Sequence, residues 1–178
     1  NGSTHARITN QIFPCAISIP MSNSMTITQW HVPIDDENCF WYAMFTSFDE
    51  PIDQEKMRNQ RLANHSLPEY LPKNNKNNRY GFDQKEQETQ TYTGMGMDIN
   101  VHDQWACESM GPIQDRTNEH LATTDKAISA YRRMLLQSIT KVEEGDQELI
   151  GIVSENNTHK IKGPIALDAI GSPEDLDA

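Results

Sequence analysis

The sequence has no long apolar run and few basic side chains, and each absence excludes a class of protein. No stretch approaches the roughly 20 apolar residues that a membrane span requires, and no basic-then-apolar leader opens the chain. Lys and Arg number 15 against 26 Asp and Glu, which gives a formal charge of −11. Clustered positive charge dominates binding to nucleic acids and anionic lipids. We therefore expect neither nucleic acid nor a membrane as a partner.

Cysteine is scarce as well. Cys15, Cys39 and Cys107 are an odd number of thiols and lie far apart in the sequence. This usage is typical of reduced core thiols and not of a disulfide framework. It indicates a reducing compartment, and we predict a cytoplasmic location.

The residues that are present suffice for one modest core that begins with antiparallel strands. The 178 residues include 5 Phe, 5 Tyr, 3 Trp and 8 Met. Residues 25–32 and 39–45 are rich in β-branched and aromatic side chains and flank the polar turn 35–38, which predicts a hairpin. Residues 4–19 are rich in β-branched side chains and are interrupted by Pro14. This pattern predicts two further strands joined at a corner.

Helical patterns follow the strands and alternate with polar segments. Asp49-Glu50-Pro51 is typical of a helix start, and a second helix is predicted from about Asn100 to Met110, before Gly111-Pro112. Between these helices, residues 73–90 are polar without a packing pattern, which favours a long surface loop. The sequence as a whole thus predicts an α+β fold dominated by antiparallel sheet.

A third helix has the clearest amphipathic pattern in the chain. It begins at Thr123 or Thr124, and apolar residues recur at spacings of three and four. These predict a buried stripe composed of Ile128, Tyr131, Leu135 and Ile139. Residues 149–153 could add a last short strand, and residues 154–178 are predicted to be a loosely packed tail.

Local motifs for catalysis or metal binding are incomplete. The six His lie at least 18 positions apart, so no helical pair of His ligands exists, and neither Gly-x-Ser-x-Gly nor Gly-Lys-Ser/Thr occurs. We interpret Asp35-Asp36 as a turn cap. Asp115-Arg116 and Glu119-His120 are interpreted as local ion pairs that fix the link between two helices.

Asp103 is the one acid whose interpretation depends on more than spacing. Taken alone, Asp103 is predicted to be a solvated side chain on the surface of a helix. His102 precedes it directly, but neighbours on a helix point about 100° apart, so at most one of the two could ligate an ion.

Four segments form a pattern long enough to be specific. They are Met25–Asp36 (MTITQWHVPIDD), Phe40–Ala43 (FWYA), Tyr92–Asn100 (YTGMGMDIN) and His102–Asp125 (HDQWACESMGPIQDRTNEHLATTD). This pattern resembles the catalytic domain of Rieske-type aromatic oxygenases, in particular the phthalate 4,5-dioxygenase and aryl-ether O-demethylase branch. The similarity runs from about Arg7 to Leu136.

The resemblance implies a fold and a domain organisation. It implies a curved antiparallel sheet with helices, the helix-grip or START-like type, which is incomplete here. Residues 1–153 would be the C-terminal part of the oxygenase catalytic domain and residues 154–178 a tail. The N-terminal Rieske domain would be absent, since no cysteine in this sequence has His two or three positions after it, as a Rieske cluster needs.

The resemblance also implies the cofactors. In the family a mononuclear nonheme Fe(II) is held by two His and one Asp, and Asp103, five residues before Glu108, stands in the place of that Asp. The two His would lie upstream of this chain, and a [2Fe–2S] cluster would sit on the absent domain. An external reductase would supply electrons through that cluster.

The implied activity is O₂-dependent hydroxylation or O-demethylation of an aromatic substrate in aromatic catabolism. Arg7 is a candidate to bind a carboxylated substrate, because guanidinium suits bidentate recognition; an exposed strand arginine is the alternative. We predict that the isolated chain is inactive and holds no stoichiometric iron. The other function left open is a stand-alone small-molecule binding module without iron. An unpaired strand edge near residues 4–13 predicts a homo-oligomer.

Overall fold

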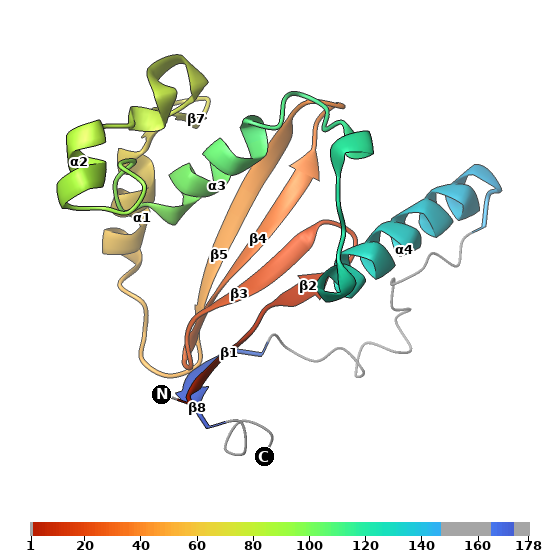
Figure 1. Ribbon diagram of the computed structural model, residues 1–178, viewed down its shortest axis with the longest axis horizontal. Coiled ribbons are helices and arrows are strands. Elements are labelled where there is room, and N and C mark those ends of the chain that lie inside the picture. Colours follow the sequence, from red (N-terminus) through yellow and green to blue (C-terminus); the bar gives the residue numbers. More distant parts are fainter. Residues whose placement is uncertain (1, 147–164, 173–178) are drawn as a thin grey trace. The chain divides into compact units, whose positions relative to one another are not determined.

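The computed structural model describes residues 2–146 and 165–172 (Figure 1). These residues belong to two compact units. The first, unit 1, is built from Asn1–Ile52 and His120–Ala178, and the second, unit 2, is Asp53–Glu119. The predicted strand at 149–153 lies outside the described residues. The elements confirm the predicted α+β class with a curved antiparallel sheet.

Unit 1 is organised around a four-stranded antiparallel sheet in the order β2-β3-β4-β5. Its strands are β2 (Asn10–Ile12), β3 (Ala16–Ser22), β4 (Met25–Pro33) and β5 (Cys39–Ser47). The predicted hairpin is confirmed as β4 and β5, which pair without interruption from Met25 opposite Ser47 to Pro33 opposite Cys39. The centre of the sheet is polar, since Ser18 and Thr28 are buried and joined by a hydroxyl hydrogen bond of 3.1 Å.

A second, two-stranded sheet joins the two ends of the chain. In it β1 (Thr4–Ile8) pairs antiparallel with β8 (Leu167–Gly171). The expectation of a loosely packed tail is therefore wrong for these five residues of 154–178. Backbone pairing of Arg7 with Asp168, and a side-chain contact between His5 and Asp168, hold β8 in register. The unpaired strand edge predicted near residues 4–13 is therefore limited to β2, which is an edge strand of the four-stranded sheet, because β1 is paired with β8.

The long helix of unit 1 forms where the sequence predicts it. A short 3₁₀ turn, η3 (Thr123–Asp125), leads into α4 (Lys126–Glu143). The prediction that its apolar stripe is buried is wrong, because Ile128 and Ile139 are 45% and 53% exposed. Tyr131 is anchored: its ring meets Phe13 edge-on with centroids 6.2 Å apart, and its hydroxyl donates to the Pro14 carbonyl. Beyond that contact α4 runs away from the β2 end of the sheet (Figure 1).

Unit 2 is mainly helical. It contains α1 (Gln54–Ala63), β6 (His65–Ser66), β7 (Leu71–Pro72), η1 (Lys76–Gly81), α2 (Gln84–Thr89), α3 (Ile99–Glu108) and η2 (Arg116–Asn118). The predicted helix after Pro51 begins three residues later than Pro51, since Asp53 is its N-cap and accepts from the Lys56 amide. The predicted helix at 100–110 is confirmed as α3.

Residues 73–90 differ from the predicted surface loop. They form η1 and α2, and Tyr80 from η1 is 6% exposed in the core of unit 2, together with Met95 and Val101. The physical reason is that a tight turn with left-handed backbone at Arg79 and Tyr80 points one aromatic ring inward, which no helical or strand period reveals. Within the described residues, no helix is long and apolar enough to cross a bilayer.

Candidate functional site

The predicted iron ligand Asp103 lies on α3, and the start of this helix is firmly fixed. Asp98 is its N-cap: its carboxylate accepts from the Asn100 amide at 3.1 Å. The same side chain, 17% exposed, also accepts from Arg61 at 3.3 Å and from the Asn64 amide group at 2.5 Å. Arg61 of α1 and Asn64, the C-cap of α1, thus hold Asp98 in place. This fixed cap orients α3 against the rest of unit 2.

His102 and Asp103 diverge on α3 as their spacing predicts. The His102 ring is half-buried, and its Nε2 atom lies 3.0 Å from both the Thr93 hydroxyl and the Gly96 carbonyl. Because a carbonyl can only accept, Nε2 carries the proton, and His102 is engaged in holding the loop before α3. Asp103 is exposed. Its role as an iron ligand stays a prediction.

The described residues contain no group of three or more His, Cys, Asp or Glu side chains placed to hold a metal ion. A carboxylate at Asp103 has the donor type that nonheme Fe(II) accepts alongside two imidazoles. The part of the chain that the structure describes therefore fits one ligand of such a site and not a complete one. His120, the nearest histidine after α3 in sequence, is exposed and belongs to unit 1, not to the unit of α3.

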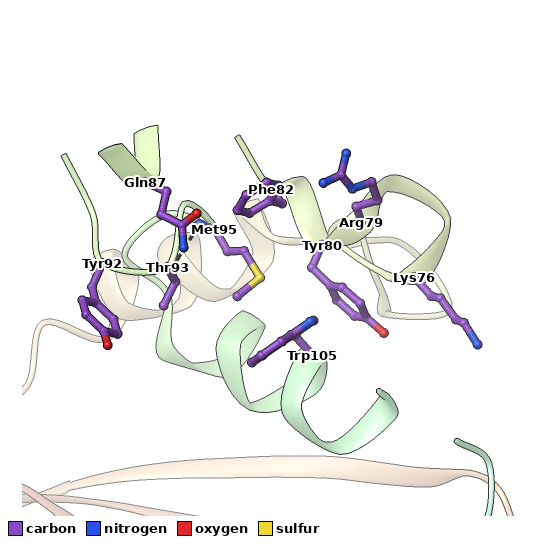
Figure 2. Close-up of a pocket in the computed structure, with 9 residues that line it drawn as sticks. All are labelled: Lys76, Arg79, Tyr80, Phe82, Gln87, Tyr92, Thr93, Met95 and Trp105. Carbon is purple, nitrogen blue, oxygen red and sulfur yellow. Dashed lines mark hydrogen bonds between the residues drawn. The ribbon is translucent and has the colours of Figure 1, made fainter. Parts of the chain in front are cut away.

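A cavity of about 510 Å³ lies on another face of α3 (Figure 2). Trp105 of α3 forms one wall, and Phe82 and Met95 form the opposite wall. Tyr80 closes one end. The remaining lining residues are Lys76, Arg79, Gln87, Tyr92 and Thr93. All of them belong to unit 2.

Hydrogen bonds hold the end of this cavity at Tyr80. The Tyr80 hydroxyl donates to the Glu108 carboxylate at 2.6 Å. Burial of the phenol, followed by this bond and the charge of Glu108, raises the pKa of Tyr80 to about 12. Tyr80 therefore stays a neutral donor at physiological pH.

The wall formed by Met95 depends on glycine. Gly94 has φ +68°, and a Cβ atom there would lie 2.6 Å from the Asp83 carbonyl oxygen. That carbonyl accepts the Gln87 amide at 3.1 Å in the first turn of α2. A second bond ties the loop down, because Glu86 Oε1 accepts the Gly96 amide at 2.8 Å.

Arg7, the predicted substrate-binding residue, lies on β1 and has intramolecular partners. Its Nη2 donates to the Pro20 carbonyl at 2.8 Å, and its Nε lies 3.9 Å from Asp168 Oδ2. The side chain is 49% exposed. These contacts are those of a structural strand arginine, and a role toward a substrate stays a prediction.

The other acids considered from sequence act locally. Asp35 accepts from the amides of Glu37 and Asn38 at 2.9 and 2.7 Å, which confirms the turn cap. The hydrogen bond from the Glu37 amide, with further help from Asn38, lowers the pKa of Asp35. Asp115 caps η2: bonds from the Thr117 hydroxyl and amide lower its pKa.

Sequence reasoning missed the cavity. Four of its lining residues lie within 76–82, the segment expected to be a surface loop. The signal that could have found them is the pair Tyr80 and Phe82 flanking Gly81 in an otherwise polar stretch, since large aromatic side chains seldom stay exposed in pairs.

Comparisons with known proteins assign the chain to a family. A family model described as LigXa C-terminal domain like matches residues 1–167. Among curated proteins the chain is similar to the phthalate 4,5-dioxygenase oxygenase subunit of Pseudomonas putida, with 27% identity over 155 residues. The similarity covers 83% of this chain and 34% of the relative, so the chain spans about a third of that relative's length.

Proposed function

The chain belongs to the LigXa C-terminal domain-like family and is part of a Rieske-type oxygenase catalytic domain, and from this premise we propose that it supplies one iron ligand, Asp103, to an aromatic oxygenase. The observation that carries the proposal is the placement of Asp103. It is an exposed carboxylate on a helix whose start is fixed by Asp98, within the region that the family model matches.

The two histidine ligands, in this proposal, come from parts of the protein outside this chain, as does the [2Fe–2S] cluster. When bound, a mononuclear iron with two His and one carboxylate leaves positions open for O₂ beside the substrate. The contribution of the described residues is positional. The bond from His102 to the loop at Thr93 and Gly96 fixes the rotation of α3, and that rotation aims Asp103.

The proposed reaction of the whole protein is hydroxylation or O-demethylation of an aromatic substrate, with a reductase as the electron-transfer partner. The name of the relative, a phthalate 4,5-dioxygenase subunit, supports an aromatic substrate and one that carries carboxylates. Residues 1–153 would form the C-terminal part of the catalytic domain. We propose a cytoplasmic location on the same grounds, and we expect the 178-residue chain alone to be inactive.

The test measures iron in the complete oxygenase that contains this chain. Asp103→Asn should remove the mononuclear iron and the oxygenase activity while leaving the cluster iron and its visible absorption intact. Glu55→Gln, an equally isosteric change at an exposed acid of α1, is the matched control and should keep both. Full retention of mononuclear iron in Asp103→Asn would refute the assignment.

Association is the other part of this proposal. β2 is an edge strand of the four-stranded sheet and carries Ile12, which is 39% exposed. An exposed apolar edge recruits a second chain, so we expect a homodimer or larger assembly of the 178-residue chain. Light scattering should show it, and Ile12→Lys should shift the population toward monomer. A monomeric parent chain across a wide concentration range would contradict this.

A further inference from the structure

The cavity of unit 2 has the size and the wall chemistry of a small-molecule site. Its volume of about 510 Å³ falls within the range of roughly 300 to 1,000 Å³ that ligand pockets occupy. Phe82 and Met95 face Trp105 across it, and Tyr80 closes one end (Figure 2). Two facing walls of aromatic and thioether side chains suit a flat ring between them.

The charged residues in the lining of the cavity have one sign. Lys76 and Arg79 are the charged residues among its lining, and no Asp or Glu lines it. The Arg79 guanidinium lies 5.0 Å from the centroid of the Phe82 ring, so the positive charge adjoins the aromatic wall directly. In a chain of formal charge −11, a cavity whose charged lining residues are both cations favours an anion over a neutral ligand.

Glu108, the acid bonded to the lining residue Tyr80, already has a hydrogen-bond partner. Glu108 accepts the Tyr80 hydroxyl at 2.6 Å, and the pKa of Tyr80, raised to about 12, keeps the phenol neutral. The end at Tyr80 therefore carries no second negative charge from a tyrosinate. Lys76 and Arg79 lie at this same end of the cavity, opposite Tyr92 and Thr93 (Figure 2).

The cationic end is built on a fixed backbone. Arg79 and Tyr80 have φ values of +55° and +58°, which non-glycine residues seldom adopt. Their turn is held by the Tyr80 amide donating to the Asn75 carbonyl at 2.8 Å and by reciprocal capping between Asn75 and Asn78. Left-handed backbone that its surroundings hold in place is a common feature of ligand clamps.

The cavity is separate from Asp103. Asp103 and Trp105 are two positions apart on α3, which places their side chains about 200° apart around the helix axis. Trp105 lines the cavity and Asp103 does not. A molecule in the cavity therefore lies on the side of α3 away from the proposed iron ligand.

We propose that the cavity of unit 2 binds a small planar aromatic anion, with the ring between Trp105 and the wall of Phe82 and Met95 and the anionic group toward the end of the cavity that Lys76 and Arg79 line. The inference stands on the cavity alone and does not require the proposed oxygenase function. It assigns this chain a second ligand site, apart from the face of α3 that carries Asp103.

Calorimetric titration of the 178-residue chain tests the proposal with 2-naphthoate and its uncharged counterpart 2-naphthamide as probes. Naphthoate should bind saturably, and naphthamide about tenfold more weakly. The indole N–H signal of Trp105, assigned by Trp105→Phe, should shift on addition of naphthoate, whereas those of Trp30 and Trp41 in unit 1 should not. These measurements need no charge variant.

Charge variants then locate the anionic group. The double change Lys76→Gln and Arg79→Gln should weaken naphthoate binding about tenfold and abolish the preference over naphthamide. Lys85→Gln, an exposed lysine on α2 outside the lining, is the matched control and should bind within twofold of the parent chain. Circular dichroism checks that each variant is folded.

Three results would overturn the proposal. They are no saturable binding of naphthoate up to about 1 mM, equal affinity for naphthoate and naphthamide in the parent chain, and unchanged naphthoate affinity in the folded double variant. The iron measurement on Asp103→Asn is independent of all three, so failure here leaves the proposed function standing and failure there leaves this site standing.

Discussion

The substitution Gly94→Ala tests whether the wall of the cavity in unit 2 is as tightly packed as its contacts indicate. A Cβ added at Gly94 would lie 2.6 Å from the Asp83 carbonyl oxygen, 2.8 Å from Gln87 Cβ and 3.1 Å from the Phe82 ring. The backbone has little room to move away. The Gly94 amide donates to the Thr91 hydroxyl at 3.0 Å, and its carbonyl accepts the Asp83 amide at 2.8 Å.

Gly96 provides the matched control. It has nearly the same backbone conformation, φ +72° against +68° at Gly94, but a Cβ at Gly96 would meet nothing within 4 Å. Gly96→Ala should therefore cost only the left-handed strain, about 1 to 2 kcal/mol. Gly94→Ala carries the same strain and adds overpacking of about 1 to 3 kcal/mol, for a total of about 2 to 5 kcal/mol. The effect of alanine on the unfolded chain is common to both and cancels in the comparison.

Amide hydrogen exchange measures this locally. The amides of Asp83 and Gln87 donate across the affected turn, to Gly94 and Asp83 respectively, and remain present in both variants. They should exchange at least about fivefold faster in Gly94→Ala than in Gly96→Ala, because the added overpacking of about 1 to 3 kcal/mol corresponds to a factor of about 5 or more. If the two variants protect these amides equally, the close packing of Gly94 against α2 is wrong.

Two further substitutions test the frame of unit 2. The pKa of Tyr80 is raised from 10 to about 12. The unfolded chain therefore releases this proton first as the pH rises, and the free energy of unfolding should fall between pH 10 and 12. Urea denaturation should show a smaller fall in Tyr80→Phe and an unchanged fall in Tyr70→Phe, which alters an exposed tyrosine. Asp98→Ala removes the cap of α3 and the partner of Arg61 and Asn64, so it should cost about 2 to 3 kcal/mol. Asp115→Ala at the exposed cap of η2 should cost clearly less stability than Asp98→Ala, and equal losses in the two would contradict the central place given to Asp98.

The hairpin of β4 and β5 was predictable because everything that determines it is local. Two β-rich segments adjoin one polar turn, and Asp35 closes that turn with bonds to residues two and three positions later. The same holds for α3, which ends at Glu108, shortly before the helix-breaking residues Gly111-Pro112.

The segment 73–90 was not predictable in the same way. Burial of Tyr80 depends on Met95 and Val101, which come later in the chain and pack together with it in the core of unit 2. The positive φ angles at Arg79 and Tyr80 give no sequence period. The cavity was invisible from sequence for that reason, although each of its walls is made of ordinary aromatic and thioether residues.

The stripe on α4 shows a different limit. Its period predicts the helix and identifies the apolar face, but burial of that face depends on what packs against it. Among the described residues, Phe13 and Pro14 meet the helix at Tyr131, while Ile128 and Ile139 remain about half exposed. Periodicity therefore establishes which side of a helix is apolar and not that this side is covered.

The ten residues of α3 show how one short helix can serve several purposes without conflict. His102 holds the loop at Thr93 and Gly96, and Trp105 lines the cavity. Asp103 lies between them in sequence but, at about 100° per residue, on a different face from either. A change at the cavity wall therefore need not alter Asp103. Loss of the His102 bonds acts differently, because Thr93 lines the cavity and His102 joins Thr93 and Gly96 to the helix that carries Asp103. His102, which ligates nothing in the proposed site, is therefore a residue of α3 that contributes to both proposed sites.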